Sequence, residues 1–203
     1  MPLNITHTTG VMEDIYAEMA GGDFIVGAGT VRDIEMTGLG AMELNSQDLT
    51  ENIVVRSTSG MTVPCVVTGD GGTVRNLIFD GVTGVDPLIQ ITAVHARYPD
   101  WRISTTRGGV EFLGATCRFN LATNWDIGSG SNTDNTYDAV TFTNADENQI
   151  HGLTAYSLNP GVADPRYAVV FDANSDNNLI YGLIAPNTGT GVSLDSGTGN
   201  TIS

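Results

Sequence analysis

The stretch that decides the fold is residues 168–180, which read AVVFDANSDNNLI and continue into Tyr181-Gly182-Leu183. Two similar stretches flank it, since residues 139–150 read AVTFTNADENQI and residues 191–202 read GVSLDSGTGNTI. Each copy has a short alternating segment, a polar turn, an asparagine and a second short segment. Alternation over a few residues, bounded by Asn, Asp and Gly, is typical of a β-strand followed by a tight turn.

Aligning the three copies places residues of one type in shared columns. The columns are Phe142, Phe171 and Leu194; Asn148, Asn178 and Asn200; and Ile150, Ile180 and Ile202. Self-similarity at a period of 20–50 residues predicts stacked supersecondary units, that is, a solenoid. We expect the asparagine column to form a structural ladder, because Asn tolerates left-handed turns and its amide pairs with the same amide one turn away. A row of sugar-binding amides is the alternative.

The composition predicts an all-β protein and excludes several partner classes. Twenty-five glycines among many Thr, Asn and Asp residues favour short strands and turns. The formal net charge is −15, with 23 acidic residues and eight basic ones, all arginine, and this charge argues against nucleic acid as a partner. No apolar run is long enough to span a membrane, and MPLNITHTTG lacks the features of a signal peptide. Cys65 and Cys117 are expected to be buried thiols, with a disulfide between them as the alternative.

Residues 1–50 differ from the rest and predict a separate N-terminal cap or attachment segment, followed by a parallel β-helix domain over residues 51–203. Within the N-terminal segment, Val11, Ile15 and Met19 recur every four residues, with Tyr16 alongside. This spacing predicts a short amphipathic helix over residues 11–20. We expect this helix to present those four side chains to a larger particle.

The repeat pattern is expected to begin at Asn52. Asn76 follows 24 residues later, and Asn148 lies three such steps beyond Asn76, so the three asparagines are predicted to share one column. The polar segment 124–138 is expected to protrude as a loop. The last copy ends at Ser203, and we expect this open edge to be covered by self-association or by docking on another surface.

Two kinds of residue are candidates for chemistry. Asp172 and Asp195 both follow a strand, and stacking would place their carboxylates about 5 Å apart, the separation found in retaining glycosidases. Capping of local backbone amides is the competing interpretation, and a Ca²⁺ site formed with Asp176 is a weaker one. Trp101 and Trp125 lie beside acidic residues and are candidates for carbohydrate or subunit-interface contacts, or for core packing.

Other signals of catalysis are missing from the sequence. The three histidines are dispersed, and no nucleotide-binding or nucleophile-elbow motif is present. The absence of lysine disfavours lyase chemistry. We therefore expect neither an enzyme nor a bound metal or cofactor.

The three repeats, with their N-x-I-x-G-L-like pattern, resemble the right-handed parallel β-helix superfamily of pectate-lyase-like and phage-tailspike-like proteins. The resemblance implies trimers in the viral members and carbohydrate-directed activity in many cellular ones. It supplies no catalytic motif that can be placed on this chain. A short, acidic chain without a signal peptide is most similar to small trimeric capsid decoration (cement) proteins.

These observations lead to three functional hypotheses. The first is a structural virion protein, a homotrimer that is made in the host cytoplasm, sits on a phage capsid and contacts the major capsid protein through its N-terminal segment. The second is a tailspike or tail-fibre protein that binds or cleaves a host surface polysaccharide. The third is a cellular polysaccharide lyase or adhesin.

Overall fold

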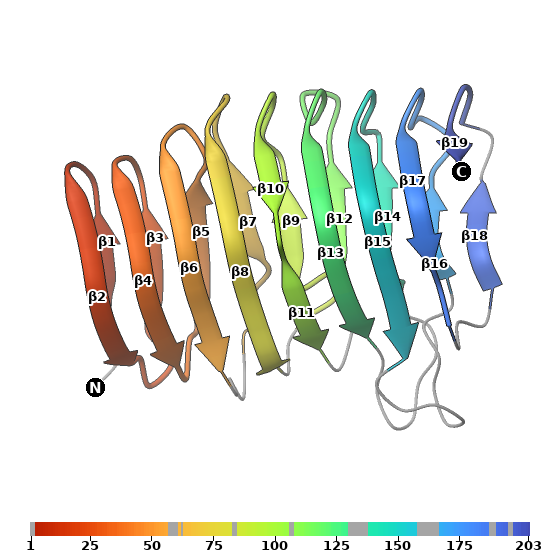
Figure 1. Cartoon of the computed structure of the whole chain (residues 1–203). Coiled ribbons are helices and arrows are strands. Elements are labelled where there is room, and N and C mark those ends of the chain that lie inside the picture. The colour runs from red at the N-terminus through yellow and green to blue at the C-terminus, as the bar shows by residue number, and fades with distance from the viewer. Residues whose placement is uncertain are drawn as a thin grey trace.

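The computed structural model describes residues 3–56, 61, 63–82, 85–105, 108–129, 138–157, 167–186, 190–194 and 197–203. Every regular element in these ranges is a β-strand, and all strand pairs are parallel (Figure 1). The described part of the chain contains no helix long and apolar enough to cross a membrane. The fold is therefore all-β, as the composition predicted.

The strands form two sheets. The first contains, in spatial order, β1 (Ile5–His7), β3 (Asp23–Val26), β5 (Ala41–Asn45), β7 (Cys65–Thr68), β9 (Ile89–Ile91), β12 (Val110–Leu113), β14 (Val140–Thr143), β16 (Tyr167–Phe171) and β18 (Thr190–Leu194). The second contains β2 (Val11–Glu18), β4 (Thr30–Thr37), β6 (Leu49–Arg56), β8 (Thr73–Val82), β10 (Arg97–Pro99) with β11 (Arg102–Thr105), β13 (Leu121–Ser129), β15 (Gln149–Ser157), β17 (Leu179–Ile184) and β19 (Thr201–Ile202).

The chain passes from one sheet to the other and back, so each pass adds one strand to both sheets (Figure 1). We call one such pass a coil. β10 and β11 share one position in the second sheet, because both pair with β8 and β13. This stacking of parallel strands is compatible with a parallel β-helix. The strands within residues 1–50 belong to the same two sheets as the later ones.

The predicted helix over residues 11–20 is wrong, because residues 11–18 form strand β2. Asp14 has a left-handed backbone (φ 57°), which inserts one extra residue into the alternation of buried and exposed positions. β4 repeats this arrangement, with Val31, Ile34 and Met36 buried around a left-handed Asp33. Apolar spacings of three and then two residues imitate helical periodicity, and this similarity produced the error.

Large aromatic side chains are stacked between the two sheets. The rings of Phe112, Phe142 and Phe171 are fully buried and lie 4.8 and 4.9 Å apart between successive centroids. Leu194 pairs with Phe171 in the strand register and so continues the predicted column along the backbone. The isoleucine column is placed similarly, with Ile150 and Ile180 buried and the remaining member, Ile202, half-buried.

A buried ladder of amides runs beside this core. Asn148 Nδ2 donates to Asn178 Oδ1 (3.2 Å), and Asn178 Nδ2 donates to Asn200 Oδ1 (3.1 Å). Asn120, which was not predicted, extends the ladder by donating to Asn148 Oδ1 (2.9 Å). The predicted alignment of Asn76 with Asn148 is wrong, because the strand register places Asn148 in a different column.

Asn76 belongs to a second, outward-facing row. Its members all have left-handed backbones: Asp14, Asp33, Asn52, Asn76, Asp100, Asn124, Gly152 and Gly182. Asn52 donates to Asp33 (2.7 Å) and accepts from Asn76 (2.8 Å).

Both cysteines are free and buried, so the disulfide alternative is excluded.

Candidate functional site

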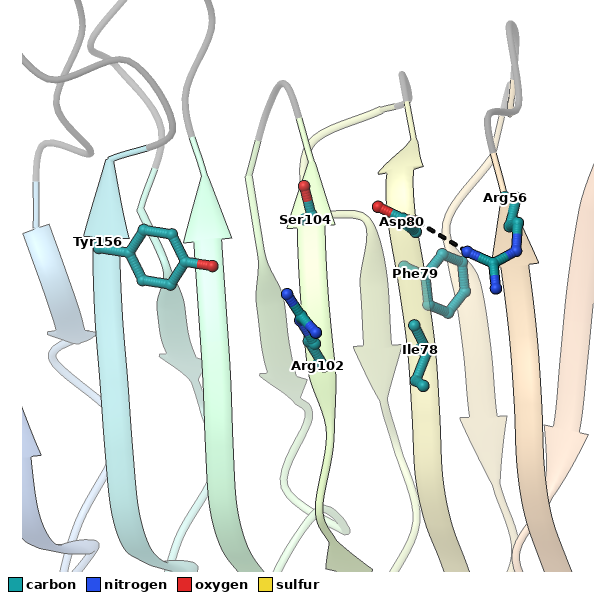
Figure 2. A pocket seen from close by; sticks show the side chains of 7 residues that line it. All are labelled: Arg56, Ile78, Phe79, Asp80, Arg102, Ser104 and Tyr156. Carbon is teal, nitrogen blue, oxygen red and sulfur yellow. Dashed lines mark hydrogen bonds and ion pairs between the residues drawn. The ribbon is translucent and has the colours of Figure 1, made fainter.

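The outer face of the second sheet has a hollow of about 370 Å³ near the carboxyl ends of its strands (Figure 2). Its lining residues come from β6, β8, β11 and β15: Arg56, Ile78, Phe79, Asp80, Arg102, Ser104 and Tyr156. None of these residues was singled out in the sequence. The hollow gathers two guanidinium groups, a carboxylate, two hydroxyls and an aromatic ring.

The strand register explains why the surface is hollow here. Ser104 of β11, Gly128 of β13 and Tyr156 of β15 occupy one row across three neighbouring strands. Gly128 contributes no side chain, so the row is open between Ser104 and Tyr156. The Tyr156 ring extends from β15 to β13, with its hydroxyl on the side that faces β11 (Figure 2).

One side of the hollow is fixed by an ion-pair network. Arg56 Nε donates to Glu35 (2.9 Å), and its Nη1 donates to Asp80 (2.9 Å). The hydrogen bond and charge of Glu35, more than those of Asp80, raise the pKa of Arg56. All three side chains are exposed, so the network contributes little to stability. Its effect is to hold the Asp80 carboxylate at the rim.

Two neighbouring groups have unused hydrogen-bonding capacity: Arg102, on the other side of the hollow, and Asp126, beside it on β13. Arg102 forms no ion pair within the described residues, although it is the register partner of Asp126. The Oδ1 atom of Asp126 is buried and has no hydrogen-bond partner there. Burial, followed by the charge of Asp126, raises the pKa of Tyr156, and Arg102 acts in the opposite direction. A buried polar atom without a partner marks a place for a water molecule or a polar ligand.

The arrangement is suited to binding a molecule rich in hydroxyl groups. Arg102, Ser104 and the Tyr156 hydroxyl offer donors, Asp80 offers acceptors, and the Tyr156 ring supplies an apolar wall. The residues predicted to contact sugar lie elsewhere. Trp101 and Trp125 are each 1% exposed and stack on each other with centroids 4.9 Å apart. Both are core side chains and present no ring face to a ligand.

The indole N–H groups of the two tryptophans are also satisfied internally. Trp101 Nε1 donates to the carbonyl of Val74 (2.8 Å), and Trp125 Nε1 donates to that of Tyr98 (2.7 Å). Each bond ties one coil to the preceding coil. The tryptophans therefore stabilise the stack below the hollow.

The predicted carboxylate pair is only partly described. Asp172 accepts hydrogen bonds from the main-chain N–H groups of Asn144 (3.1 Å) and Asn174 (3.1 Å) and from the Ser175 hydroxyl (2.6 Å). It therefore caps turns of its own coil and the preceding one. Asp195 lies outside the described residues. Asp176, the third candidate calcium ligand, accepts from the main-chain N–H (2.6 Å) and hydroxyl (3.0 Å) of Thr198.

The predicted attachment residues lie on and just after β2. Val11 and Tyr16 are 60% and 65% exposed, Ile15 is half-buried, and Met19 is fully buried in the core. Because β2 is a strand, these residues do not share one face: two point outward and two inward.

No single residue type in the sequence predicts the hollow, but the position of one glycine does indicate it. Gly128 is a glycine at an outward strand position, and its neighbours in the same row carry a hydroxyl (Ser104) and an aromatic ring (Tyr156). No group of three or more His, Cys, Asp or Glu residues in the described ranges is arranged to hold a metal ion.

Comparisons with protein-family models, curated proteins and solved structures find no match to this chain.

Proposed function

We propose that this chain is a right-handed parallel β-helix that serves as a structural virion protein, a homotrimer that decorates a phage capsid. The proposal rests on the resemblance of the three repeats to that superfamily. It is also supported by one structural observation: within the described residues, rows of polar side chains bond one coil to the next.

This bonding along the stack is present on the surface as well as in the core. Glu13, Arg32, Glu51 and Arg75 form one row of alternating charge on β2, β4, β6 and β8, in which Arg32 pairs with Glu13 and Arg75 pairs with Glu51. The buried amide ladder does the same near the other end of the stack. Side chains committed to neighbouring coils stiffen a scaffold and are not free for proton transfer.

The N-terminal segment is the proposed attachment region, with the major capsid protein as partner. Within the described residues, β2 has one strand neighbour, β4, so its other edge is unpaired. An unpaired edge with exposed Val11 and Tyr16 is suited to pairing with another chain. We expect Tyr16→Lys to weaken co-sedimentation with capsids. Tyr181→Lys, which changes an aromatic residue exposed to a similar degree (60%) on β17, is the control.

Self-association is tested by light scattering during gel filtration at micromolar concentration. The proposal expects a mass three times the 21.4 kDa of one chain. A monomer under these conditions would contradict the homotrimer. Capsid co-sedimentation that is equally strong for wild type and Tyr16→Lys would contradict the attachment region while leaving the trimer intact.

A second candidate function is binding of a surface glycan in the hollow. The observation in its favour is the juxtaposition in one hollow of the Tyr156 ring and Arg102, which forms no ion pair within the described residues. Glycan-array screening of the wild-type protein should identify a ligand. Arg102→Gln should then lower its affinity at least tenfold, whereas Arg32→Gln, the same change outside this hollow, should not. Equal affinities for the two variants would exclude the hollow as the binding site.

A further inference from the structure

Phe119 is an aromatic residue in a strained backbone conformation at the surface. It has a φ of 58° and is 44% exposed. The register places it in a column of left-handed turn residues: Gly71, His95, Phe119, Glu147, Asn177 and Gly199. Glycine and asparagine adopt this conformation readily, whereas a bulky side chain rarely does. A strained residue that also exposes apolar surface suggests a function outside the monomer.

The Phe119 ring is held rigidly by its neighbours. It stacks on the imidazole of His95, with centroids 5.1 Å apart and planes 5° from parallel. The Arg118 guanidinium lies 5.4 Å from the ring centroid. His95 is in turn positioned by Asp70, 3.2 Å from its Nδ1 atom. A fixed aromatic ring loses little conformational entropy when a partner covers it.

Two arginines lie beside this ring, and neither forms an ion pair within the described residues, in a chain of net charge −15. Arg97 lines the adjoining surface with Phe119 and Leu121, and it forms no ion pair in the part of the chain that the structure describes. Arg118 contributes a second guanidinium. Two carboxylates accompany them, because Glu147 also lines this surface and Asp70 is bonded to His95. We call Phe119 with Arg97 and Arg118 the aromatic knob.

A complementary hollow of about 190 Å³ lies on the outer face of the first sheet, over β3, β5 and β7. Its lining is mostly apolar, with two carboxylates: Asp23, Ile25, Ala41, Met42, Glu43, Val63, Pro64 and Val66. Val63 is 46% exposed, so apolar surface is left open to water. Neither acidic side chain forms an ion pair within the described residues. We call this feature the acidic-rimmed hollow.

We propose that the aromatic knob of one copy inserts into the acidic-rimmed hollow of a second copy. Phe119 would cover the apolar lining, while Arg97 and Arg118 meet the carboxylates of Asp23 and Glu43. Burial of an aromatic ring supplies affinity, and the opposite charges select this face over others that repel. The inference rests on the self-association proposed above and names its contact surface.

The contact joins two different patches and is therefore heterologous. Such a contact generates a closed trimer only if the rotation from one copy to the next is 120° about a common axis. Phe119 follows β12, which lies three strands beyond β5 in the first sheet, or about 14 Å along the stack. A closed trimer built on this contact must therefore incline its stacks to the threefold axis.

The test uses Phe119→Asn, because asparagine accepts the left-handed backbone and removes the ring. The variant should convert the trimer to a monomer in light scattering. Tyr181→Asn, an equally drastic change at another exposed aromatic residue, should leave the mass unchanged. A Phe119→Asn protein that is still trimeric overturns this inference and leaves the trimer standing. A monomeric wild-type protein overturns the trimer as well.

Cross-linking gives a second readout that does not depend on the stability of that variant. Gln149→Cys, which lies on the same surface as Phe119 and keeps the ring, and Val63→Cys proteins are prepared separately and then mixed under mild oxidation. A disulfide-linked dimer should form in the mixture, and neither protein alone should form one, since the native Cys65 and Cys117 are buried. Dimers of equal yield in the separate proteins would overturn the proposed pairing, as would their absence from the mixture when wild type is trimeric.

Discussion

Replacing Asn148 with alanine removes the centre of the buried amide ladder. The side chain is fully buried, and its Nδ2 atom donates to the carbonyls of Cys117 (2.9 Å) and Asp146 (3.0 Å). Its Oδ1 atom accepts from the main-chain N–H (3.2 Å) and the side-chain amide (2.9 Å) of Asn120. Alanine can make none of these bonds.

The size of the effect follows from the groups left behind. The carbonyl of Cys117 and the main-chain N–H of Asn120 each lose a partner at a buried site. A buried polar group without a partner costs about 1–3 kcal/mol, so the two together cost about 2–6 kcal/mol. We therefore expect Asn148→Ala to lower the free energy of unfolding by about 3–5 kcal/mol, a large part of the ~5–15 kcal/mol typical of a domain.

Urea denaturation followed by tryptophan fluorescence measures this change, because both tryptophans are buried. Asn52→Gly is the matched control, since Asn52 also bonds to both neighbouring coils but lies in the outward-facing row, and glycine keeps its left-handed backbone. Water can replace its lost bonds, so we expect a loss of about 1 kcal/mol. Equal losses for the two variants would refute the argument that burial of the ladder gives it its strength.

The remaining predictions concern the core and the hollow. Phe142→Ala should lower the free energy of unfolding by about 3–5 kcal/mol in the same assay, because it removes the middle ring of a buried stack. Burial raises the pKa of Cys117 to about 12, so its thiol should react with a thiol reagent at pH 8 only after unfolding. This pKa is higher in the folded protein than the ~8.5 of a free thiol. The contribution of Cys117 to stability should therefore be fully present below pH ~8.5 and decline towards pH ~12. Urea denaturation at pH 8 and at pH 10.5 measures the difference in the free energy of unfolding. An ultraviolet titration measures the pKa of Tyr156 when the curve of the Tyr156→Phe variant is subtracted as the reference. Asp126→Asn should lower this pKa, and Arg102→Gln should raise it.

The all-β class and the parallel stacking could be predicted because the repeats align residues with simple physical roles. Phe142 and Phe171 align as a buried column, and Asn148 and Asn178 as amides that pair between turns. These columns depend only on spacing within one copy and its neighbour. Handedness, by contrast, does not follow from the columns and remains part of the proposed function.

Two parts of the structure could not be predicted, for different reasons. The left-handed residue Asp14 changes the apolar spacing of β2, so a strand imitates a helix in sequence. The hollow depends on the number of residues in each coil, because Ser104 and Tyr156 become near neighbours only when two intervening turns have the right lengths. Trp101 and Trp125 were attractive as sugar contacts because of their residue type, but they are core residues because their strand positions point inward.

The side-chain bonds between coils also have a consequence for how the chain acquires its structure. They join residues 18 to 33 positions apart, as in Asn45 to Gly27 and Asn178 to Ala145, so each coil depends only on its immediate neighbours. A ribosome synthesises about 5–20 residues per second, so a new coil emerges every few seconds. Each one meets an edge that is already formed and can dock on it before the next is made. The order of synthesis is thus also an order in which the stack can grow.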